Sequence, residues 1–240
     1  MQFHARRTTL ALFASAALLL AGCAQVPRQA FNAAAATNLH KVVVTQAQNQ
    51  DEYDVNMVGH PGMSFGLIGG LIAAADLQAK TSQLTKAIDP KETRLQERFV
   101  EKLSAGLKSD GYDTEIVVLP KDTKEDQALA LAKQHAGNDA VLLVQMRAGY
   151  WAAGPSSDYF PRIIAKVKAV DSKTDKVLYE DTITYGYAMP QLQTVHLASD
   201  STYRFKDMDA LVVSPVKIRE GLYAGVEAVT HQIVSDLKKK

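Results

Sequence analysis

Ala140-Val-Leu-Leu-Val-Gln-Met146 is the stretch that decides the fold of this 240-residue chain. Gln145 is its one polar residue, and the other six residues are apolar. A short and almost continuously apolar run is typical of a central strand that is buried on both faces of a sheet. A sheet that contains such a strand has to be covered by helices, so the stretch predicts an α/β fold.

The chain before this stretch alternates strands with helices. The clearest helix begins at Pro90 behind Asp89, a combination typical of a helix N-terminus, and Gly111 ends it. Its apolar residues recur every three to four positions, at Leu95, Phe99, Leu103 and Leu107. In chain order the patterns predict strands over 41–45 and 112–119, a short strand or a loop over 51–58, and helices over 64–88, 90–110 and 122–136.

The chain after this stretch begins with a β-hairpin. Residues 162–170 and 177–187 alternate apolar with polar around a turn at 172–175, which is typical of a hairpin with one solvated face. Residues 189–214 are irregular apart from a short element at 208–213, and a long helix follows over 216–239. We therefore expect one α/β domain over 39–240, with a single mixed β-sheet, helices packed on it and a long C-terminal helix.

The N-terminal segment has the composition of an export signal. Arg6 and Arg7 precede an apolar run over 10–20 that only Ser15 interrupts, and Leu20-Ala21-Gly22-Cys23 closes it. About eleven apolar residues are too few for a transmembrane helix, which needs roughly 20. Residues 1–22 are therefore interpreted as a signal peptide. The arginine pair fits an ordinary Sec signal better than a twin-arginine signal, because the residues that flank it lack the twin-arginine pattern.

Cys23 is the only cysteine of the chain, and it stands directly after the small residues Ala21 and Gly22. This arrangement resembles the lipobox of a Gram-negative bacterial lipoprotein, although a secretory signal with an incidental cysteine is the alternative. The resemblance implies cleavage before Cys23, acylation of its thiol and of the new N-terminus, and attachment to a membrane. Several acyl chains hold a protein on a membrane far more firmly than one. Ala24, in place of an aspartate, implies the outer membrane and a domain that faces the periplasm.

Residues 23–38 are expected to be the lipidated cysteine and a flexible tether. The segment contains one proline, many alanines and no periodic apolar face. Its 15 residues after Cys23 reach at most about 50 Å when fully extended, and about 20 Å as a flexible coil. The domain is therefore expected to stay close to its membrane.

The charge of the mature chain excludes a nucleic-acid partner. Without Arg6 and Arg7, 25 of the 27 basic residues remain against 26 acidic residues, so no basic field exists for phosphate binding. Acylation of Cys23 would leave no thiol for a disulfide, even in an oxidising compartment. The hydrophobic content of 47% is sufficient for a core without a disulfide.

Enzymatic signatures are absent from the sequence. It contains no Gly-x-Ser-x-Gly motif, no P-loop and no His-Glu-x-x-His motif. Its six histidines, at positions 4, 40, 60, 135, 196 and 231, lack the spacing of metal ligands. We therefore expect no catalytic residues, no metal and no cofactor.

A row of glycines is the most distinctive internal feature. Gly62, Gly66 and Gly70 are four residues apart, and Ala74 continues the row. On a helix these residues share one face, where a second backbone could approach closely. Each glycine costs about 1 kcal/mol against alanine inside a helix, so the row requires a reason. Three alternatives remain open: a loop that becomes a helix near Gly66 and whose glycines pack against the sheet of the same domain, contact with a partner helix, and shallow membrane insertion. The apolar run over 63–75 is too short to span a bilayer.

Residues 149–160 form the second candidate contact region. They include Trp151, the only tryptophan, together with Tyr159 and Phe160, among Gly, Pro and Ser residues. The composition predicts an exposed loop between two strands, and aromatic side chains on a loop commonly form a partner surface. The alternative is that these side chains fold back and cover the core.

These observations favour a non-enzymatic envelope lipoprotein that binds another envelope protein or a second copy of itself. The order of elements loosely resembles the α/β domains of lipoproteins that activate peptidoglycan synthases and of the curli-secretion lipoprotein. The main alternative is a small-ligand carrier or an envelope stress component with a pocket near the Tyr150–Phe160 region. An unrecognised hydrolase is the third and weakest hypothesis.

Overall fold

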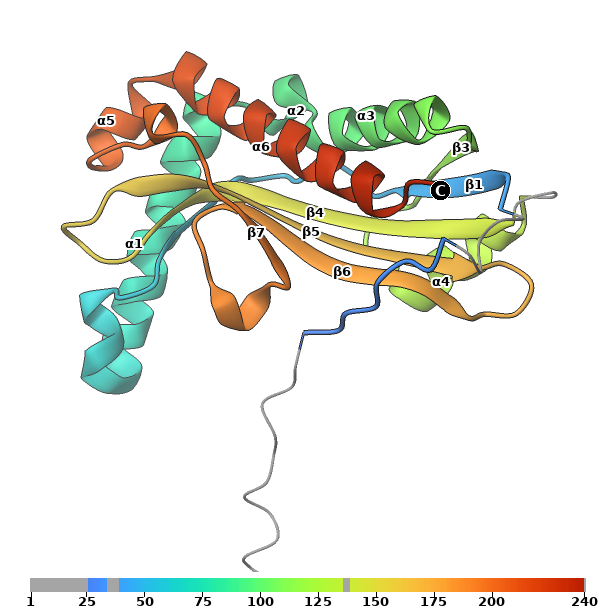
Figure 1. Ribbon diagram of the computed structural model, residues 1–240. Coiled ribbons are helices and arrows are strands. Elements are labelled where there is room, and N and C mark those ends of the chain that lie inside the picture. The colour runs from blue at the N-terminus through green and yellow to red at the C-terminus, as the bar shows by residue number, and fades with distance from the viewer. Residues whose placement is uncertain (1–25, 34–38, 136–138, 240) are drawn as a thin grey trace, which may run out of the picture.

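β4 (Ala140–Ala152) is the central strand of a mixed sheet (Figure 1). The computed structural model describes residues 26–33, 39–135 and 139–239. The other strands are β1 (Lys41–Gln46), β2 (Asp54–Met57), β3 (Asp113–Val118), β5 (Tyr159–Asp171), β6 (Val177–Gly186) and β7 (Val195–Leu197). The α-helices are α1 (Gly66–Ala87), α2 (Pro90–Thr93), α3 (Leu95–Ser109), α4 (Glu125–Lys133), α5 (Met208–Val212) and α6 (Pro215–Asp236). Short 3₁₀ helices are η1 (Pro61–Phe65), η2 (Pro190–Leu192) and η3 (Ser201–Tyr203).

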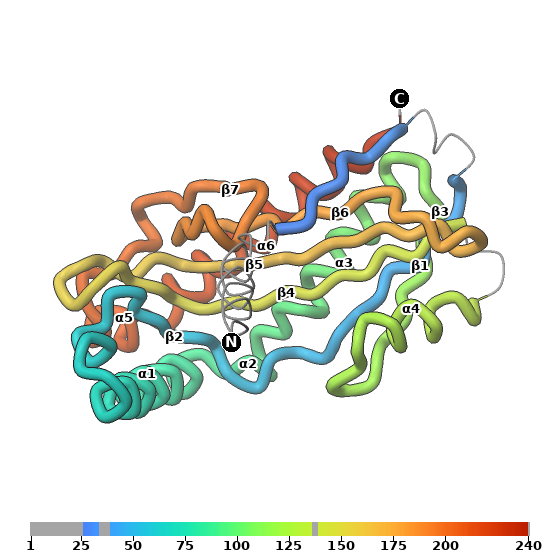
Figure 2. Tube along the Cα trace, turned by 90° about the horizontal axis from the view of Figure 1, so that it is seen from below, coloured from blue at the N-terminus to red at the C-terminus, as the bar shows by residue number. Residues whose placement is uncertain are grey.

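The seven strands, all within the described residues, have the order β3-β1-β4-β5-β6-β7, and β2 pairs with β4 off this path. β1 lies parallel to both β3 and β4, while β5 is antiparallel to β4 and β6. α3 and α6 cover one face of this sheet, and α4 covers part of the other face (Figures 1 and 2). The structure confirms the predicted α/β fold with a single mixed sheet and a long C-terminal helix.

The two faces of β4 lie in two separate cores. Leu142 and Val144 pack into the main core with α3 and α6, whereas Val141 and Leu143 pack into a smaller core with α4. All four side chains are buried. This burial confirms that the Ala140–Met146 stretch forms a central strand covered on both faces.

β4 is longer than β1 and β2, the two strands that lie parallel to it along the same edge. β1 pairs with its beginning and β2 pairs with its end, so its middle has no partner strand there. Side chains supply the missing hydrogen bonds: the N–H of Val144 donates to Oγ1 of Thr45 at 3.2 Å, and the N–H of Ala148 donates to Oε1 of Gln50 at 2.6 Å. These bonds satisfy backbone groups that would otherwise be left unpaired.

The outer edge of β2 is covered by α1. The N–H of Val55 donates to Oγ1 of Thr81 at 3.0 Å, and the N–H of Tyr53 donates to Oγ1 of Thr85 at 3.2 Å. The two threonines are four residues apart, so they lie on one face of the helix. The C-terminal half of α1 therefore takes the place of a neighbouring strand.

Three details differ from the sequence-based expectation. The helix expected over 90–110 is divided into α2 and α3, because Arg94 has a left-handed backbone with φ of 47°. β7 lies in the region expected to be irregular. β4 and β5 extend into the expected loop over 149–160, so only the residues between Ala152 and Tyr159 connect them.

The central position of β4 leads to a stability prediction. Leu142→Ala removes a fully buried side chain between the sheet and the helices, and a cavity of this kind costs about 2–5 kcal/mol in the free energy of unfolding. Gln145→Ala is the matched control on the same strand, because Gln145 is exposed and should change stability by less than about 0.5 kcal/mol. Denaturant unfolding followed by circular dichroism measures both, and equal effects would contradict this assignment of the core.

Candidate interaction surface

α1 has a fixed half and a projecting half. Its C-terminal half is held by the hydrogen bonds of Thr81 and Thr85 to β2 and by the fully buried Leu84. Its N-terminal half extends past the sheet together with η1 (Figure 1). We call residues 61–75, which comprise η1 and the projecting part of α1, the apolar hairpin.

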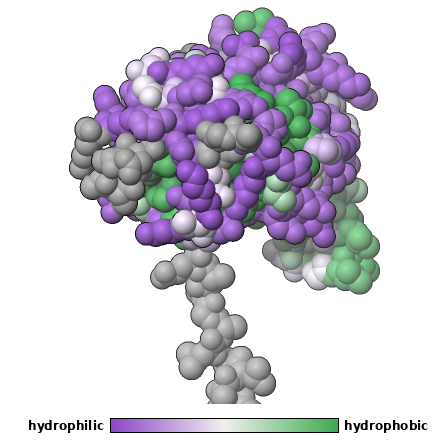
Figure 3. Space-filling model, turned by 90° about the vertical axis from the view of Figure 1, so that its right-hand side faces the viewer, coloured by the Kyte–Doolittle hydropathy of each residue, from purple (hydrophilic) through white to green (hydrophobic). Residues whose placement is uncertain are grey.

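The apolar hairpin exposes large hydrophobic side chains. Leu67 is 82% exposed, and the other members of this group are between 57% and 75% exposed: Met63, Phe65, Ile68, Leu71 and Ile72. Monomeric proteins rarely expose so many adjacent large apolar side chains without a function for them. Figure 3 shows apolar residues gathered at the projecting end, apart from the mainly hydrophilic body.

The expected glycine row is divided between two elements. Gly62 lies in η1, whereas Gly66 begins α1 with φ of 62°, so the chain reverses between them. The close contact is made instead by Gly62 and Gly69, because a Cβ on Gly69 would overlap the carbonyl oxygen of Gly62. Gly66 and Gly70 have open space at the Cβ position. The row therefore does not pack against the sheet as a single face.

A polar collar bounds the apolar hairpin on the side of the sheet. Asp76 accepts a hydrogen bond from the ammonium group of Lys80 and lies 3.1 Å from Nε2 of His60. The Lys80 hydrogen bond and, to a smaller extent, His60 hold the pKa of Asp76 below its usual range. The other ring nitrogen of His60 accepts from the N–H of Gly62 at 3.0 Å. This histidine thereby links the start of η1 to α1.

One stretch of the described residues, Pro61–Ala87, is long and apolar enough by composition to cross a membrane. Its second half, however, carries the threonines that cover β2 and the buried Leu84. A membrane span would require this half to leave the sheet and expose the edge of β2. In the folded domain, the exposed apolar part of this stretch is the apolar hairpin.

Substitutions at two neighbouring glycines test whether η1 packs against α1 in the apolar hairpin. Gly69→Ala should open the contact between η1 and α1, because overpacking of this kind costs about 1–3 kcal/mol. Gly70→Ala is the matched control, since its Cβ meets nothing and alanine favours a helix by about 1 kcal/mol. Hydrogen exchange of the hairpin amides should become faster in the first variant and slower in the second. Equal exchange in both variants would show that η1 and α1 do not pack together.

The aromatic residues of the second candidate region lie on strands and not on a loop. Tyr150 and Tyr159 are buried in the main core, so Tyr159 is removed from any contact surface in this fold. Trp151 and Phe160 are directly opposite each other on β4 and β5, and both are half-buried. Each ring lies 6.1 Å from the ring of Tyr187. The predicted exposed loop is therefore wrong for Trp151, Tyr159 and Phe160, and the alternative that they cover the core holds for the buried Tyr159.

A buried arginine lies beneath these rings. The guanidinium of Arg162 is 4.3 Å from the centre of the Trp151 ring and donates to the carbonyl oxygen of Tyr187. Burial lowers the pKa of Arg162 to about 10, so this side chain is charged at neutral pH. Within the described residues, its Nε and Nη2 atoms have no hydrogen-bond partner. The sequence pattern did not reveal this residue, because Arg162 alternates with apolar residues as an exposed strand residue would.

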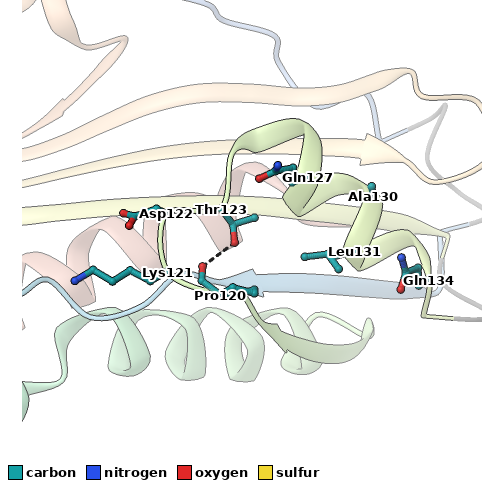
Figure 4. A pocket seen from close by; sticks show the side chains of 8 residues that line it. All are labelled: Pro120, Lys121, Asp122, Thr123, Gln127, Ala130, Leu131 and Gln134. Atoms are coloured by element: carbon teal, nitrogen blue, oxygen red, sulfur yellow. Dashed lines mark hydrogen bonds between the residues drawn. The ribbon is translucent and has the colours of Figure 1, made fainter.

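Two hollows on the surface of the described residues are open to solvent. The larger, of about 430 Å³, lies between the end of β3 and α4, where Thr123 donates to the carbonyl oxygen of Pro120 at 2.7 Å (Figure 4). The smaller, of about 290 Å³, lies between β2 and α1, with Trp151 at its edge. Trp151 thus borders a shallow surface hollow, which is unlike the enclosed apolar cavities that bury most of a small ligand.

The described residues contain no group of three or more His, Cys, Asp or Glu side chains that could hold a metal ion. Three of the described histidines lie against side chains that are not part of any metal site. His60 pairs with Asp76, His135 with Glu115, and His196 lies 3.4 Å from the hydroxyl of Thr184. Cys23, the proposed acylation site, lies outside the described residues.

The segment expected to be a tether has unexpected contacts with the sheet. Gln29 exchanges two backbone hydrogen bonds with Glu180 of β6, at 2.7 and 2.9 Å. Next to it, Nε of Arg28 lies 3.6 Å from a carboxylate oxygen of the buried Asp181, and Phe31 packs against the main core. The sequence shows no apolar period here because backbone groups and single side chains make the attachment.

The buried Asp181 gives a pH-dependent prediction. Burial raises the pKa of its carboxyl group, so the folded state binds a proton more tightly than the unfolded state does. The stabilisation from protonated Asp181 is therefore lost as the pH rises through this raised pKa. Asp181→Asn should remove this part of the pH dependence, while its side-chain oxygen can still accept from the N–H of Thr182. Unfolding measured from pH 4 to pH 7 tests this, and an unchanged slope would contradict it.

No family model matches the chain, and no curated protein matches it. A solved structure of a neuraminyllactose-binding hemagglutinin homolog from Helicobacter pylori is 14% identical, with a TM-score of 0.43, over 84% of this chain and 87% of that one. A PelC dodecamer from Paraburkholderia phytofirmans is 11% identical, with a TM-score of 0.34, over 90% and 94% of the two chains.

A lipoprotein from Neisseria meningitidis is 18% identical, with a TM-score of 0.30, over 82% of this chain and 99% of that one. Because all three TM-scores are below 0.5, these similarities support no conclusion about function.

Proposed function

We propose that this chain is a lipid-anchored protein of the bacterial cell envelope that acts by association and not by catalysis. The observation that carries the proposal is the apolar hairpin, which projects from the domain with six large hydrophobic side chains exposed. Such a surface favours contact with another hydrophobic surface, because burial of one leucine or phenylalanine side chain contributes about 1.5–3 kcal/mol.

The anchor part of the proposal rests on Cys23 and on the residues directly after it. The lipobox pattern supports acylation of Cys23, and Ala24 supports sorting to the outer membrane with the domain in the periplasm. Gln29 is only six residues from Cys23 and is bonded to β6. The attachment to β6 gives the anchor a short reach, which favours a partner close to the membrane that holds the lipid.

Substitutions of exposed apolar side chains test association through the apolar hairpin better than substitutions of its glycines. Gly66 and Gly70 have open space at their Cβ positions, so larger side chains there would enlarge the apolar surface and would not block it. Leu67 and Leu71 are better positions, because their exposed side chains can become polar without a cavity in the core.

The carrier hypothesis has weaker support. Trp151 borders an open hollow, and Tyr150 and Tyr159 are part of the core. A small-ligand carrier requires an enclosure that removes most of its ligand from water. Association through the hairpin is the function that this geometry favours.

Replacement of the cysteine tests the anchor. Cys23→Ser should abolish incorporation of a palmitate analogue and release the protein from the membrane fraction, because serine lacks the thiol that is acylated. Gln25→Ser is the matched control and should keep both properties. Metabolic labelling followed by fractionation measures this. A natural chain without palmitate, or a serine variant that remains labelled in the membrane, would contradict the proposal.

A further inference from the structure

The described chain begins close to the proposed anchor. Val26 is three residues after Cys23, and three residues span at most about 10 Å. The contacts of Arg28 and Gln29 with β6 then hold the start of the described chain against the domain. The acyl chains on Cys23 would therefore enter a membrane close to a known side of the sheet.

The apolar hairpin lies on this same side. In Figure 1, the N-terminal segment and the projecting end of α1 are both below the sheet, while α3 and α6 are above it. Figure 2, seen from below, shows α1 end-on and residues 26–33 alongside β6, with which Gln29 pairs. A membrane that holds the acylated Cys23 would thus face the end of the hairpin.

The chemistry of the hairpin matches the interior of a lipid leaflet. Residues 61–75 contain no charged side chain, and Ser64 is the one residue among them with a polar side chain. From Gly66 to Asp76 the helix rises about 15 Å, which is about half of the 30 Å hydrocarbon core of a bilayer. His60, Asp76 and Lys80 follow at the depth where polar headgroups begin.

The arrangement of the exposed side chains favours lipid over a protein partner. Leu67, Ile68, Leu71 and Ile72 cover an arc of about 140° on the helix. Met63 and Phe65 extend the apolar surface onto η1. Protein interfaces carry about one hydrogen bond per 100–200 Å², and among residues 61–75 only Ser64 has a polar side chain that could form one. Lipid tails require no hydrogen bonds.

We propose that the apolar hairpin inserts into the lipid leaflet that holds the acyl chains of Cys23, as a second point of attachment. This inference rests on the proposed anchor. The insertion is limited to one leaflet, because Asp76, which pairs with Lys80 and begins the charged part of α1, lies only about 15 Å from Gly66 along the helix. Two attachment points restrict the orientation of the domain, so the face covered by α3 and α6 is directed away from the membrane.

The test uses the full acylated chain in vesicles of phosphatidylethanolamine and phosphatidylglycerol. Leu71→Cys supplies a free thiol for an environment-sensitive fluorophore, because acylation occupies the thiol of Cys23. Val216→Cys is the matched control, since Val216 is a similarly exposed apolar residue at the start of α6. We expect nitroxide-labelled lipids to quench the fluorophore at position 71, with a blue-shifted emission. Aqueous iodide should quench the fluorophore at position 216.

A further variant and the natural chain distinguish lipid insertion from contact with a second copy and from failure of the anchor. Addition of Leu67→Ser and Ile68→Ser to Leu71→Cys should abolish the lipid quenching, and both replaced residues are exposed, so the fold should remain. Equal iodide quenching at positions 71 and 216 would overturn the proposal. Protection from both quenchers, with disulfide-linked dimers of Leu71→Cys, would instead identify a second copy as the partner and would also overturn it. A thiol probe that labels Cys23 in the natural chain would disprove the anchor separately.

Discussion

The hydrogen-bonding requirement of β4 is the constraint on which the rest of the structure depends. This strand has thirteen residues, and β1 pairs with only its first part. The far end is completed by β2, and the middle is completed by the side chains of Thr45 and Gln50. Because a buried N–H without a partner is costly, β2 has to lie at the far end of β4. The position of β2 in turn determines the position of α1.

α1 shows how one helix can serve two purposes. Its C-terminal half covers the edge of β2 through two threonine hydroxyls, which protects an edge that could otherwise pair with another chain. Its N-terminal half continues in the same direction and leaves the domain. The projection of the apolar hairpin is thus a geometric consequence of how the other half is held. The contact of Gly62 with Gly69 then keeps η1 against the helix.

The candidate surfaces differ in how well the sequence predicted them. The apolar run over 63–75 and its limited length were visible in the sequence, and the run is the exposed surface. The helix face predicted for Gly62, Gly66 and Gly70 was wrong, because α1 begins only at Gly66, which has a left-handed backbone. The alternative of a loop that becomes a helix near Gly66 was right about this start, but Gly66 and Gly70 do not pack against the sheet. The aromatic region was expected to be a loop, yet its residues continue the pairing of β4 with β5. Gly149, which suggested a loop, is accommodated within β4, while Gly154 and Pro155 lie in the short connection between β4 and β5.

The sequence by itself determined the type and order of most elements, since these follow from local periodicity: the apolar run of β4, the three-to-four spacing of α3 and α6, and the alternation of β5 and β6. It also predicted a lipobox at Cys23. The tertiary structure decided which half of α1 is buried, that Arg162 lies beneath Trp151, and that Gln29 is bonded to β6. These outcomes depend on hydrogen bonds and contacts between residues far apart in the chain, which leave no periodic signal in the sequence around either partner.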